Sequence, residues 1–490
     1  MNNVRVRFAP SPTGPLHIGG ARSALFNFLL AKKYNGTFIV RIEDTDIERS
    51  SRESEANILE SLRWLGITWD EGIDAINDPE TAKKHGPYRQ TERLDIYNVY
   101  IEKLLASGQA YKCYCTEEEL EAERESLTAK GETPRYLGKC RSLTAEQQAK
   151  LQAEGRKASI RFRVPEDEIA TVHDLVRGEV NFETNGIGDY IIVKSDGIPT
   201  YNFAVVIDDV QMEITHVVRG EEHLSNTPRQ ILLYKALGLP EPTFAHVSLI
   251  LGKDRTKMSK RHGSTSVVRY KDEGYLPQAL INFLALLGWA PEGEEEIFTM
   301  EQLIEKFSLD RVSKSPAVFD MDKLQWMNGL YLRQLPEEEY LADAMPYIAK
   351  AGIVDVNTAK GKAWAELAAL TLRDAISCLS EITDSLQAFT GADVAIENDE
   401  AAEILKEEHL PQLCEAFIAK LPQESILPEE AKKILKELTK ELGLPGKKVF
   451  MPLRVAITGQ VHGRDLDKTI ALLGPALVKQ RLENVKQYFV

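Results

Sequence analysis

The sequence predicts a protein of several domains, with an α/β part first and an all-α part after it. Its 490 residues are more than one hydrophobic core usually serves, so we expect roughly two to four domains. Residues 4–8 alternate like a strand, residues 21–33 have helical spacing, and residues 37–42 form a second strand-like run. Strand, helix and strand in this order predict a parallel α/β unit. Beyond Leu276 the pattern is almost entirely helical, which predicts the all-α part.

The segment that follows the first α/β unit predicts an insertion. Residues 116–155 are polar, rich in Glu and Lys, and helical in pattern, whereas residues 159–193 return to short strand-like runs. We therefore expect an inserted domain over roughly residues 90–195. After it, residues 191–207 and 214–219 have the apolar pattern of core strands in the α/β domain.

Composition predicts a cytoplasmic protein that does not enter a membrane. The 43% hydrophobic and 28% charged residues are typical of globular proteins. The N-terminus lacks the apolar stretch of a signal peptide, and the longest apolar stretch, residues 279–290, is interrupted by Asn282. Five cysteines do not make a disulfide framework. The net charge of −15 excludes a protein that is basic throughout. Residues 253–271 and 431–490 nevertheless carry net charges of +6 and +7, which suit either a local RNA-binding face or ordinary solvated surface.

The segment His17-Ile18-Gly19-Gly20 predicts a phosphate-binding turn. It follows the Pro/Gly-rich residues 10–15, which force a loop between the first strand and the first helix. A helix N-terminus presents unpaired N–H groups and a partial positive charge, and Gly19 and Gly20 let the backbone approach a ligand. His17 can donate a hydrogen bond to a phosphate oxygen or a ribose. An ordinary Pro/Gly turn before a helix is the alternative.

The segment Lys257-Met258-Ser259-Lys260-Arg261 predicts a second phosphate-binding element. When ATP activates an acid, pyrophosphate leaves the α-phosphorus and negative charge builds on phosphate oxygens. The ammonium groups of Lys257 and Lys260 would stabilise that charge, and Ser259 could donate a hydrogen bond. Glycines lie on both sides of the segment and suit a loop that moves. A basic surface loop is the alternative.

These two segments, in this order, resemble the two signature motifs of class I aminoacyl-tRNA synthetases. Gly20 in place of histidine and Arg261 in place of serine depart from the strict motifs as the glutamyl branch does. Further segments resemble those of glutamyl and glutaminyl enzymes: residues 41–46 (RIEDTD), 85–91 (HGPYRQT), 196–204 (DGIPTYNFA), 219–228 (RGEEHLSNTP) and 318–329. The resemblance implies a Rossmann-type class I synthetase catalytic domain with an α+β insertion, followed by helical stem-contact and anticodon-binding domains.

The resemblance also divides the chain. It implies a first catalytic half at 1–90, an acceptor-binding insertion at 91–195, a second catalytic half at 196–250, a stem-contact domain with the Lys257–Arg261 loop at 251–335, and helical anticodon-binding domains at 336–385 and 386–490.

Roles at an ATP site follow by the same resemblance. The catalytic residues would be His17, Gly19, Gly20, Lys257 and Lys260. The ATP-binding residues would be Pro10, Thr13, His17, Gly19, Gly20, Glu222, Met258, Ser259 and Lys260.

A glutamate pocket is the next implication. Glutamate has two carboxylates and one ammonium, which two arginines and one carboxylate would complement. The resemblance assigns Arg7 and Arg219 to the carboxylates, Glu43 to the ammonium, and Ser11 and Tyr201 to further hydrogen bonds. Arginine pairs with a carboxylate through two parallel hydrogen bonds, and a buried arginine facing an amide is left unpaired, which disfavours glutamine. A structural ion pair, such as Arg41 with Glu43, is the alternative.

Three cysteines in the insertion raise the prediction of a zinc site. Cys113 and Cys115 are separated by one residue, a shorter gap than thiolate zinc sites usually have. Some relatives bind zinc in this insertion through such a pair and ligands downstream, and Tyr136 with Cys140 matches one variant. Ser142 stands where another variant has histidine. Three ordinary cysteines in a small domain are the alternative.

The C-terminal third resembles the anticodon-binding end of bacterial glutamyl enzymes. Residues 435–444 carry a helical stripe of leucines, and residues 446–459 match the last, all-helical domain. Lys447, Lys448 and Arg454 could contact phosphate or base, with solvated charge as the alternative. Glutaminyl enzymes of this subclass have β-barrels at this end, and a paralogue that attaches glutamate to a queuosine base of tRNA lacks the end altogether.

The resemblance therefore implies a ligase of the bacterial glutamyl-tRNA synthetase family. It would form glutamyl-adenylate from L-glutamate and ATP and transfer glutamate to tRNA(Glu), with Mg²⁺ sharing the phosphate charge and activation requiring bound tRNA. We expect a cytoplasmic monomer. One alternative is a non-discriminating form that also charges tRNA(Gln), decided by anticodon contacts around residues 364–381. Another is a catalytically inactive RNA-binding or regulatory homologue.

Overall fold

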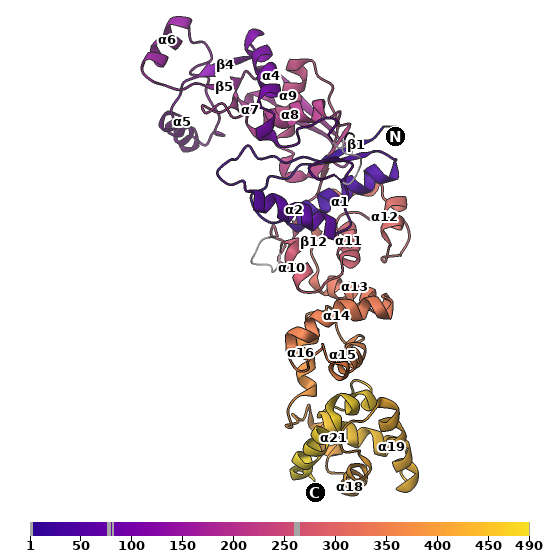
Figure 1. Ribbon diagram of the computed structural model, residues 1–490. Coiled ribbons are helices and arrows are strands. Elements are labelled where there is room, and N and C mark those ends of the chain that lie inside the picture. Colours follow the sequence, from indigo (N-terminus) through magenta and orange to yellow (C-terminus); the bar gives the residue numbers. More distant parts are fainter. Residues whose placement is uncertain (1–2, 76–79, 81–82, 259–264, 490) are drawn as a thin grey trace. The chain divides into compact units, whose positions relative to one another are not determined.

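The chain forms two compact units in the computed structural model, which describes residues 3–75, 80, 83–258 and 265–489. Unit 1 comprises residues 1–271 and 277–324, and unit 2 comprises residues 272–276 and 325–490. All strands formed by the described residues belong to unit 1, whereas the described part of unit 2 is helical (Figure 1). The predicted order, α/β part and then all-α part, is confirmed.

Unit 1 begins with alternating strands and helices. They are β1 (Arg5–Phe8), α1 (Ile18–Lys33), β2 (Thr37–Val40), α2 (Arg52–Trp64) and β3 (Glu71–Gly72). The three strands pair in parallel in the order β1-β2-β3. The predicted strand–helix–strand unit is therefore confirmed.

A second set of strands extends this arrangement. β9 (His216–Gly220), β10 (Thr243–Val247) and β6 (Ile169–Asp174) pair in parallel, and β7 (Gly178–Glu183) adds to β6 in antiparallel fashion. The N–H of Thr215 donates to the carbonyl of Arg5 at 2.9 Å, which joins the start of β9 to β1. The order is thus β3-β2-β1-β9-β10-β6-β7. Strands β2 and β3 are added on one side of β1, whereas β9 and β10 are added on its other side, so the strand order reverses between β1 and β9. Open parallel sheets bind ligands beyond the carboxyl ends of the strands at such a switch point.

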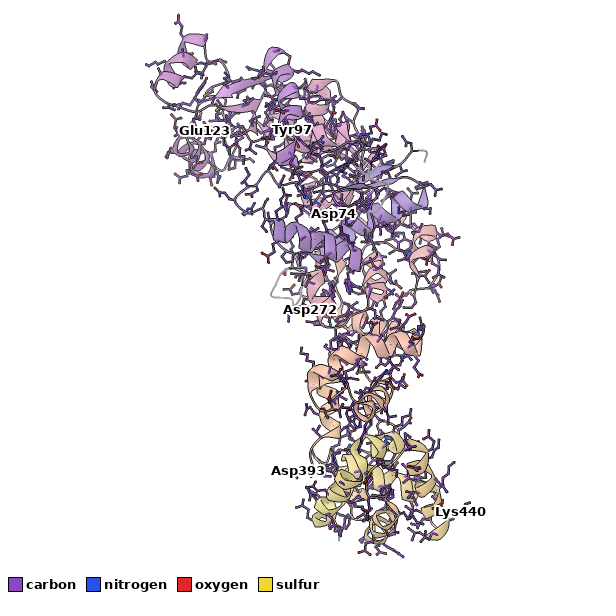
Figure 2. The ribbon with its side chains drawn as sticks, viewed as in Figure 1. Asp74, Tyr97, Glu123, Asp272, Asp393 and Lys440 are labelled. Atoms are coloured by element: carbon purple, nitrogen blue, oxygen red, sulfur yellow. The ribbon has the colours of Figure 1, made fainter. Side chains whose placement is uncertain are left out.

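Helices α4 (Leu94–Ala106), α8 (Tyr201–Gln211) and α9 (Thr227–Leu237) share an apolar core with this second set of strands. Tyr97, labelled in Figure 2, is fully buried in this core. The expectation of core strand throughout residues 191–207 is wrong, because the residues from Tyr201 form α8. A short run that is apolar on every side fits a buried strand and a buried helix equally well.

The stretch between α4 and α8 contributes to two sheets. β4 (Ala110–Cys113), β5 (Ser159–Phe162) and β8 (Tyr190–Val193) form a separate antiparallel sheet. Helices α5 (Glu117–Ala129) and α6 (Ala145–Ala153) lie between β4 and β5, and α7 (Thr184–Ile187) follows β7. The β6–β7 hairpin comes from the same stretch but pairs with β10. The six-part division of the chain stays a prediction.

The rest of the chain is mainly helical. Unit 1 continues with β11 (Ile250–Leu251), α10 (Val267–Asp272), α11 (Pro277–Leu286), α12 (Met300–Lys306), β12 (Ala317–Val318) and the start of α13 (Met321–Gln334). Unit 2 contains α14 (Glu337–Ala351), α15 (Ala359–Leu372), α16 (Glu381–Ser385), α17 (Asp399–Ile404), α18 (Leu410–Lys420), α19 (Pro428–Glu441), α20 (Lys447–Thr458) and α21 (Leu466–Asn484). Short 3-10 helices are η1 (Gln90–Glu92), η2 (Glu221–His223), η4 (Leu309–Arg311), η5 (Leu386–Phe389) and η6 (Val485–Tyr488). None of the helices in the described ranges has the length and apolarity needed to cross a bilayer.

Candidate active site

A cavity of about 650 Å³ opens at the switch point of unit 1. Its walls come mainly from the residues that follow β1 and from those that end and follow β9. The residues from the sequence analysis that line it are Arg7, Pro10, Ser11, Thr13, His17, Gly19, Gly20, Glu43, Tyr201, Arg219 and Glu222. One cavity therefore gathers the whole predicted glutamate set and the part of the predicted ATP set that lies before residue 223.

His17 lies at the N-terminus of α1 and caps it. Its Nδ1 accepts a hydrogen bond from the N–H of Gly19 at 3.1 Å, so in the neutral ring the proton is on Nε2. Burial, and next the charge of Lys257, lower the pKa of His17. The result is a neutral imidazole whose Nε2 donor, like the N–H of Gly20, meets no acceptor among the described residues. A helix N-terminus with such donors suits an anion.

Lys257 and Met258 are the two residues of the second predicted phosphate-binding segment that the structure describes. Met258 is buried and donates from its N–H to the carbonyl of Ile250, while Lys257 is near enough for its charge to act on His17. The chain also returns to this place, since the N–H of Ile18 donates to the carbonyl of Thr265 at 2.9 Å. Lys257 and Met258 do not line the cavity itself. Ser259 and Lys260 lie outside the described residues.

Arg219 is buried yet has only neutral hydrogen-bond partners among the residues that the structure describes. Its Nη2 donates to Thr227 Oγ1 and Gln230 Oε1, both at 2.8 Å. Its Nε donates to His246 Nε2 at 3.1 Å, and its Nη1 donates to Tyr201 Oη at 3.2 Å. The side chain is 6% exposed and also stacks over the ring of Phe244. A buried cation without an adjacent carboxylate is costly, so this position suits the binding of an anion.

Arg7 is held differently. Its Nε donates to Asp209 Oδ1 at 3.1 Å, and its two terminal nitrogens have no partner among the described side chains. Asp209 also accepts from Arg41 Nη1 at 2.8 Å. Arg7 is thereby fixed at its inner nitrogen while its outer edge remains available toward the cavity.

Glu43 forms an ion pair with Arg41, the structural pair that the sequence analysis gave as the alternative to a ligand-binding role. Arg41 Nη2 donates to Glu43 Oε1 at 3.1 Å, and both side chains are buried. Burial raises the pKa of Glu43, against the lowering effect of Arg41 and then Arg7. Glu43 nevertheless lines the cavity. Arg7 and Arg41 are balanced by Asp209 and Glu43, so this cluster is neutral and the charge of Arg219 is additional to it.

Several cavity residues were missed by sequence reasoning. His223 and Asn226 line the cavity, and Asp209 anchors Arg7 from α8. Asp208 and Asp209 carried a signal, because two adjacent acids inside an apolar run require buried partners. Their partners are more than 100 residues distant in the chain, for example Arg93, which donates to Asp208 at 2.7 Å.

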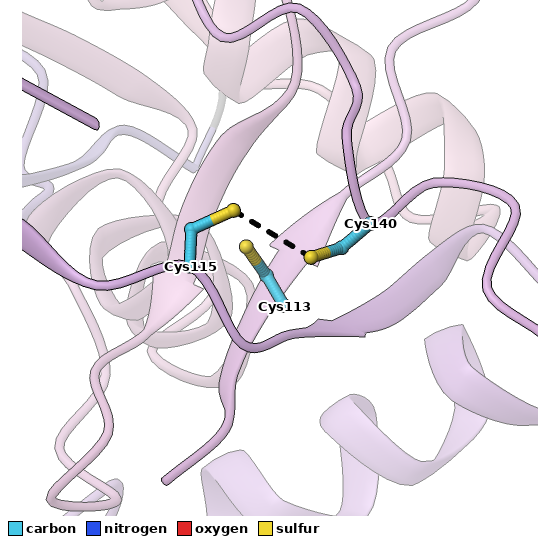
Figure 3. A group of neighbouring side chains, drawn as sticks. All are labelled: Cys113, Cys115 and Cys140. Carbon is cyan, nitrogen blue, oxygen red and sulfur yellow. Dashed lines mark hydrogen bonds between the residues drawn. The ribbon is translucent and has the colours of Figure 1, made fainter. Parts of the chain in front are cut away.

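The three cysteines of the insertion come together (Figure 3). The sulfur atoms of Cys113, Cys115 and Cys140 lie within 4.8 Å of one another, and those of Cys115 and Cys140 are 3.6 Å apart. Tetrahedral zinc with Zn–S bonds of about 2.3 Å separates its sulfurs by about 3.8 Å. Tyr136 Oη lies 3.6 Å from the sulfurs of both Cys113 and Cys115. Arg161 Nε donates to the Cys113 sulfur at 3.3 Å and would stabilise its thiolate form.

The strand order and the cavity at its switch point are those of a class I synthetase catalytic domain. The family described as tRNA synthetases class I (E and Q), catalytic domain, matches residues 3–326, and an anticodon binding domain matches residues 339–486. A glutamate–tRNA ligase from Heliobacterium modesticaldum is 60% identical, over 97% of this chain and 95% of that protein. One from Carboxydothermus hydrogenoformans is 60% identical, over 98% and 99%. A glutamate tRNA ligase from Elizabethkingia meningosepticum, crystallised in complex with its amino acid, has a TM-score of 0.84 and 35% identity over 99% of both chains. The chain belongs to the glutamate–tRNA ligase family.

Proposed function

We propose that this chain activates L-glutamate with ATP and transfers it to tRNA(Glu). The observation that carries the proposal is Arg219, a buried arginine with neutral partners, in one cavity with Arg7 and the N-terminus of α1. Cationic groups for an amino-acid carboxylate therefore lie beside a turn suited to phosphate. The relatives named above support the same activity.

The reaction has two steps. A carboxylate oxygen of glutamate attacks the α-phosphorus of ATP, the bond to pyrophosphate breaks, and glutamyl-adenylate forms. A hydroxyl of the terminal ribose of tRNA then attacks the acyl carbonyl, and AMP leaves. No side chain acts as a nucleophile, so the protein contributes by positioning and charge stabilisation.

Each residue of the predicted site has a role in this scheme. Arg7 and Arg219 bind the two carboxylates of glutamate, Glu43 meets its ammonium, and Tyr201 and Ser11 add hydrogen bonds. His17 Nε2 and the N–H of Gly20 at the start of α1 bind the phosphates of ATP, and Pro10, Thr13, Gly19 and Met258 complete the ATP site. Lys257, and with it Ser259 and Lys260, stabilises the charge that develops on pyrophosphate.

Mg²⁺ fits the carboxylate of Glu222, which lines the same cavity as His17, Gly19 and Gly20. Glu222 lines the cavity, is exposed, and has no ion-pair partner within the part of the chain that the structure describes. Mg²⁺ prefers oxygen ligands, is often bound by one or two carboxylates, and keeps several of its waters. When bound with ATP it shares the negative charge of the phosphates.

A charging assay tests the proposal. Purified tRNA(Glu) and tRNA(Gln) are each incubated with labelled glutamate, ATP and the protein. Charging of tRNA(Glu) alone is the expected result, and charging of both identifies the non-discriminating form. No charging, together with no ATP–pyrophosphate exchange in the presence of tRNA, would establish the inactive homologue.

Substitution of Arg219 tests the glutamate pocket. Arg219→Ala removes a charge that pairs with a carboxylate but not with an amide, so the preference for glutamate over glutamine should be lost. Removing one partner of a buried charge pair costs roughly 2–5 kcal/mol, which predicts a fall in kcat/KM for glutamate of at least about 30-fold. Selectivity that survives would give Arg219 another role.

We also propose a zinc ion at Cys113, Cys115, Tyr136 and Cys140, where it would fix the loop between β4 and β5. Support comes from the grouping of three sulfurs within 4.8 Å of one another, with those of Cys115 and Cys140 3.6 Å apart, near the tetrahedral spacing. Metal analysis should find one zinc per chain, and Cys113→Ser with Cys115→Ser should remove it. Cys378→Ser is the control, because Cys378 is buried in unit 2. Metal-free protein from a preparation without chelators would end this proposal. The monomeric state and the cytoplasmic location also stay predictions.

A further inference from the structure

The buried imidazole of His246 contacts Arg219 on the side away from the predicted ligand, and the buried carboxylate of Asp174 contacts that imidazole. His246 lies on β10 beside Arg219 on β9, since the two residues are partners in the β9–β10 register. Its Nδ1 is 2.6 Å from Asp174 Oδ2, and both side chains are completely buried. The carboxylate of Asp174 can only accept, so the proton of the neutral ring is on Nδ1.

This arrangement leaves His246 Nε2 as an acceptor, and Arg219 Nε donates to it at 3.1 Å. The hydroxyl of Thr227 lies 2.9 Å from the same nitrogen and accepts from Arg219 Nη2. Burial lowers the pKa of His246, although its hydrogen bond to Asp174 acts in the opposite direction. The imidazole is therefore neutral, and its orientation is set from behind by Asp174.

The chain Asp174–His246–Arg219 places a negative charge one imidazole ring away from the buried guanidinium. A carboxylate in direct contact with Arg219 would compensate its charge equally well, but it would occupy an edge that the ligand needs. The imidazole occupies only Nε. Arg219 Nη1 keeps one N–H for which the described residues supply no acceptor, and Arg219 lines the cavity.

We infer that Asp174 and His246 are positioning residues for glutamate binding: they stabilise the buried charge of Arg219 and fix its plane while leaving one N–H of Nη1 for the carboxylate. The inference rests on the proposed function, because it takes Arg219 to be a carboxylate receptor. It assigns a role to the β6–β7 hairpin, since Asp174 is the last residue of β6.

Asp174 also has a local structural function. Its Oδ1 accepts from the N–H groups of Val176 and Arg177 at 2.9 and 2.8 Å, which stabilises the turn of the hairpin. His246 makes no such turn contact through its side chain, so His246 is the sharper position for a test.

The test compares KM values in tRNA-dependent ATP–pyrophosphate exchange for the full chain and four variants. His246→Leu removes the side-chain hydrogen bonds to Asp174, Arg219 and Thr227. We expect it to raise KM for glutamate by about tenfold or more, because small misplacements of a binding group are costly. KM for ATP should change less than about twofold. His246→Gln keeps an amide that can accept from Arg219 and should restore much of the glutamate affinity. Val247→Ala is the matched control, a buried residue of the same strand on the opposite face, and should leave both KM values unchanged.

The two KM values separate positioning from folding. Partial unfolding lowers the active fraction, and with it kcat, but it leaves KM unchanged. His246→Leu with an unaltered glutamate KM, or with glutamate and ATP values raised equally, would overturn the inference. If His246→Leu does not fold, Asp174→Asn is measured instead, and an unaltered glutamate KM there overturns the inference too.

Arg219→Ala, the fourth variant, keeps this inference distinct from the proposed function. If Arg219→Ala leaves the glutamate KM unchanged, the proposed role of Arg219 is wrong, and the positioning role fails with it. If Arg219→Ala raises the glutamate KM and His246→Leu does not, only the positioning role fails.

Discussion

Replacing Asp209 by asparagine should destabilise unit 1 strongly, because Asp209 is the buried carboxylate that two buried arginines share. It accepts from Arg7 Nε at 3.1 Å and from Arg41 Nη1 at 2.8 Å, and all three side chains are less than 5% exposed. Asparagine keeps the shape and removes the charge. Breaking a buried ion pair on one side costs roughly 3–5 kcal/mol, since the remaining charge stays buried. We expect a loss of that size in the free energy of unfolding.

The pH dependence has a definite sign. Burial opposes ionisation of Asp209, but the charges of Arg7 and Arg41 outweigh it and lower the pKa of Asp209 below its ordinary value. A carboxyl group whose pKa is lower in the folded state stabilises fully above its unfolded pKa of about 3.9. That contribution disappears as the pH falls through the folded-state pKa. The difference between the natural chain and Asp209→Asn should therefore be constant near neutral pH and should shrink in acid.

Hydrogen exchange followed by mass spectrometry measures this difference within unit 1. The slowest-exchanging amides of β1 and α8 should exchange roughly 10²- to 10⁴-fold faster in Asp209→Asn, which corresponds to the loss of roughly 3–5 kcal/mol. Asp95→Asn is the control, an exposed acid on the first turn of α4, with an expected loss of at most about 1 kcal/mol. Equal exchange rates for Asp209→Asn and Asp95→Asn would refute the view that this cluster depends on Asp209.

Three further substitutions test the cavity. Lys257→Ala should lower the rate of adenylate formation roughly 10²- to 10³-fold in single-turnover experiments, whereas Lys253→Ala, at an exposed ion pair with Asp322, should not. The same Lys257→Ala change should raise the pKa of His17 in an NMR titration, because the charge of Lys257 lowers it; an unshifted pKa would place Lys257 away from His17. His17→Ala removes the Nε2 donor and should lower the exchange rate with little change in KM for glutamate; a change in that KM alone would contradict the phosphate role. Gly220→Ala places a Cβ 2.2 Å from Glu222 Oε2, so that carboxylate must move and KM for ATP should rise, whereas Gly186→Ala, which meets no atom within 4 Å, should be neutral. An unchanged KM for ATP in Gly220→Ala would remove Glu222 from the ATP site.

Local patterns were sufficient for the frame of the site. The strand at Arg5–Phe8, the Pro/Gly loop and the helix at Ile18–Lys33 are each specified by nearby residues, and all three are found. The motif resemblance correctly identified the family, because it depends on the order of short segments and not on their contacts. The roles of individual residues remain predictions, including those of Ser259 and Lys260.

Contacts between residues far apart in the chain could not be predicted from the sequence. Asp209 pairs with Arg7 across 202 residues, and Asp174 with His246 across 72. No periodicity connects such positions. The helix α8 was mistaken for a strand for a related reason: its apolar run is buried on most sides, so no polar face revealed a helical period.

The position of β1 in the sheet has a consequence for synthesis on the ribosome. β1 lies between β2 and β9, so one of its edges has no neighbouring strand until residues 216–220 have been translated. Until then Arg7 also lacks Asp209, and Arg5 lacks the carbonyl of Met212 to which it donates. At roughly 5–20 residues per second, this wait lasts about 10–40 s. Arg5 can pair with Glu71 much earlier, so the nascent N-terminal segment exposes an open strand edge and an Arg7 without its buried carboxylate for that time.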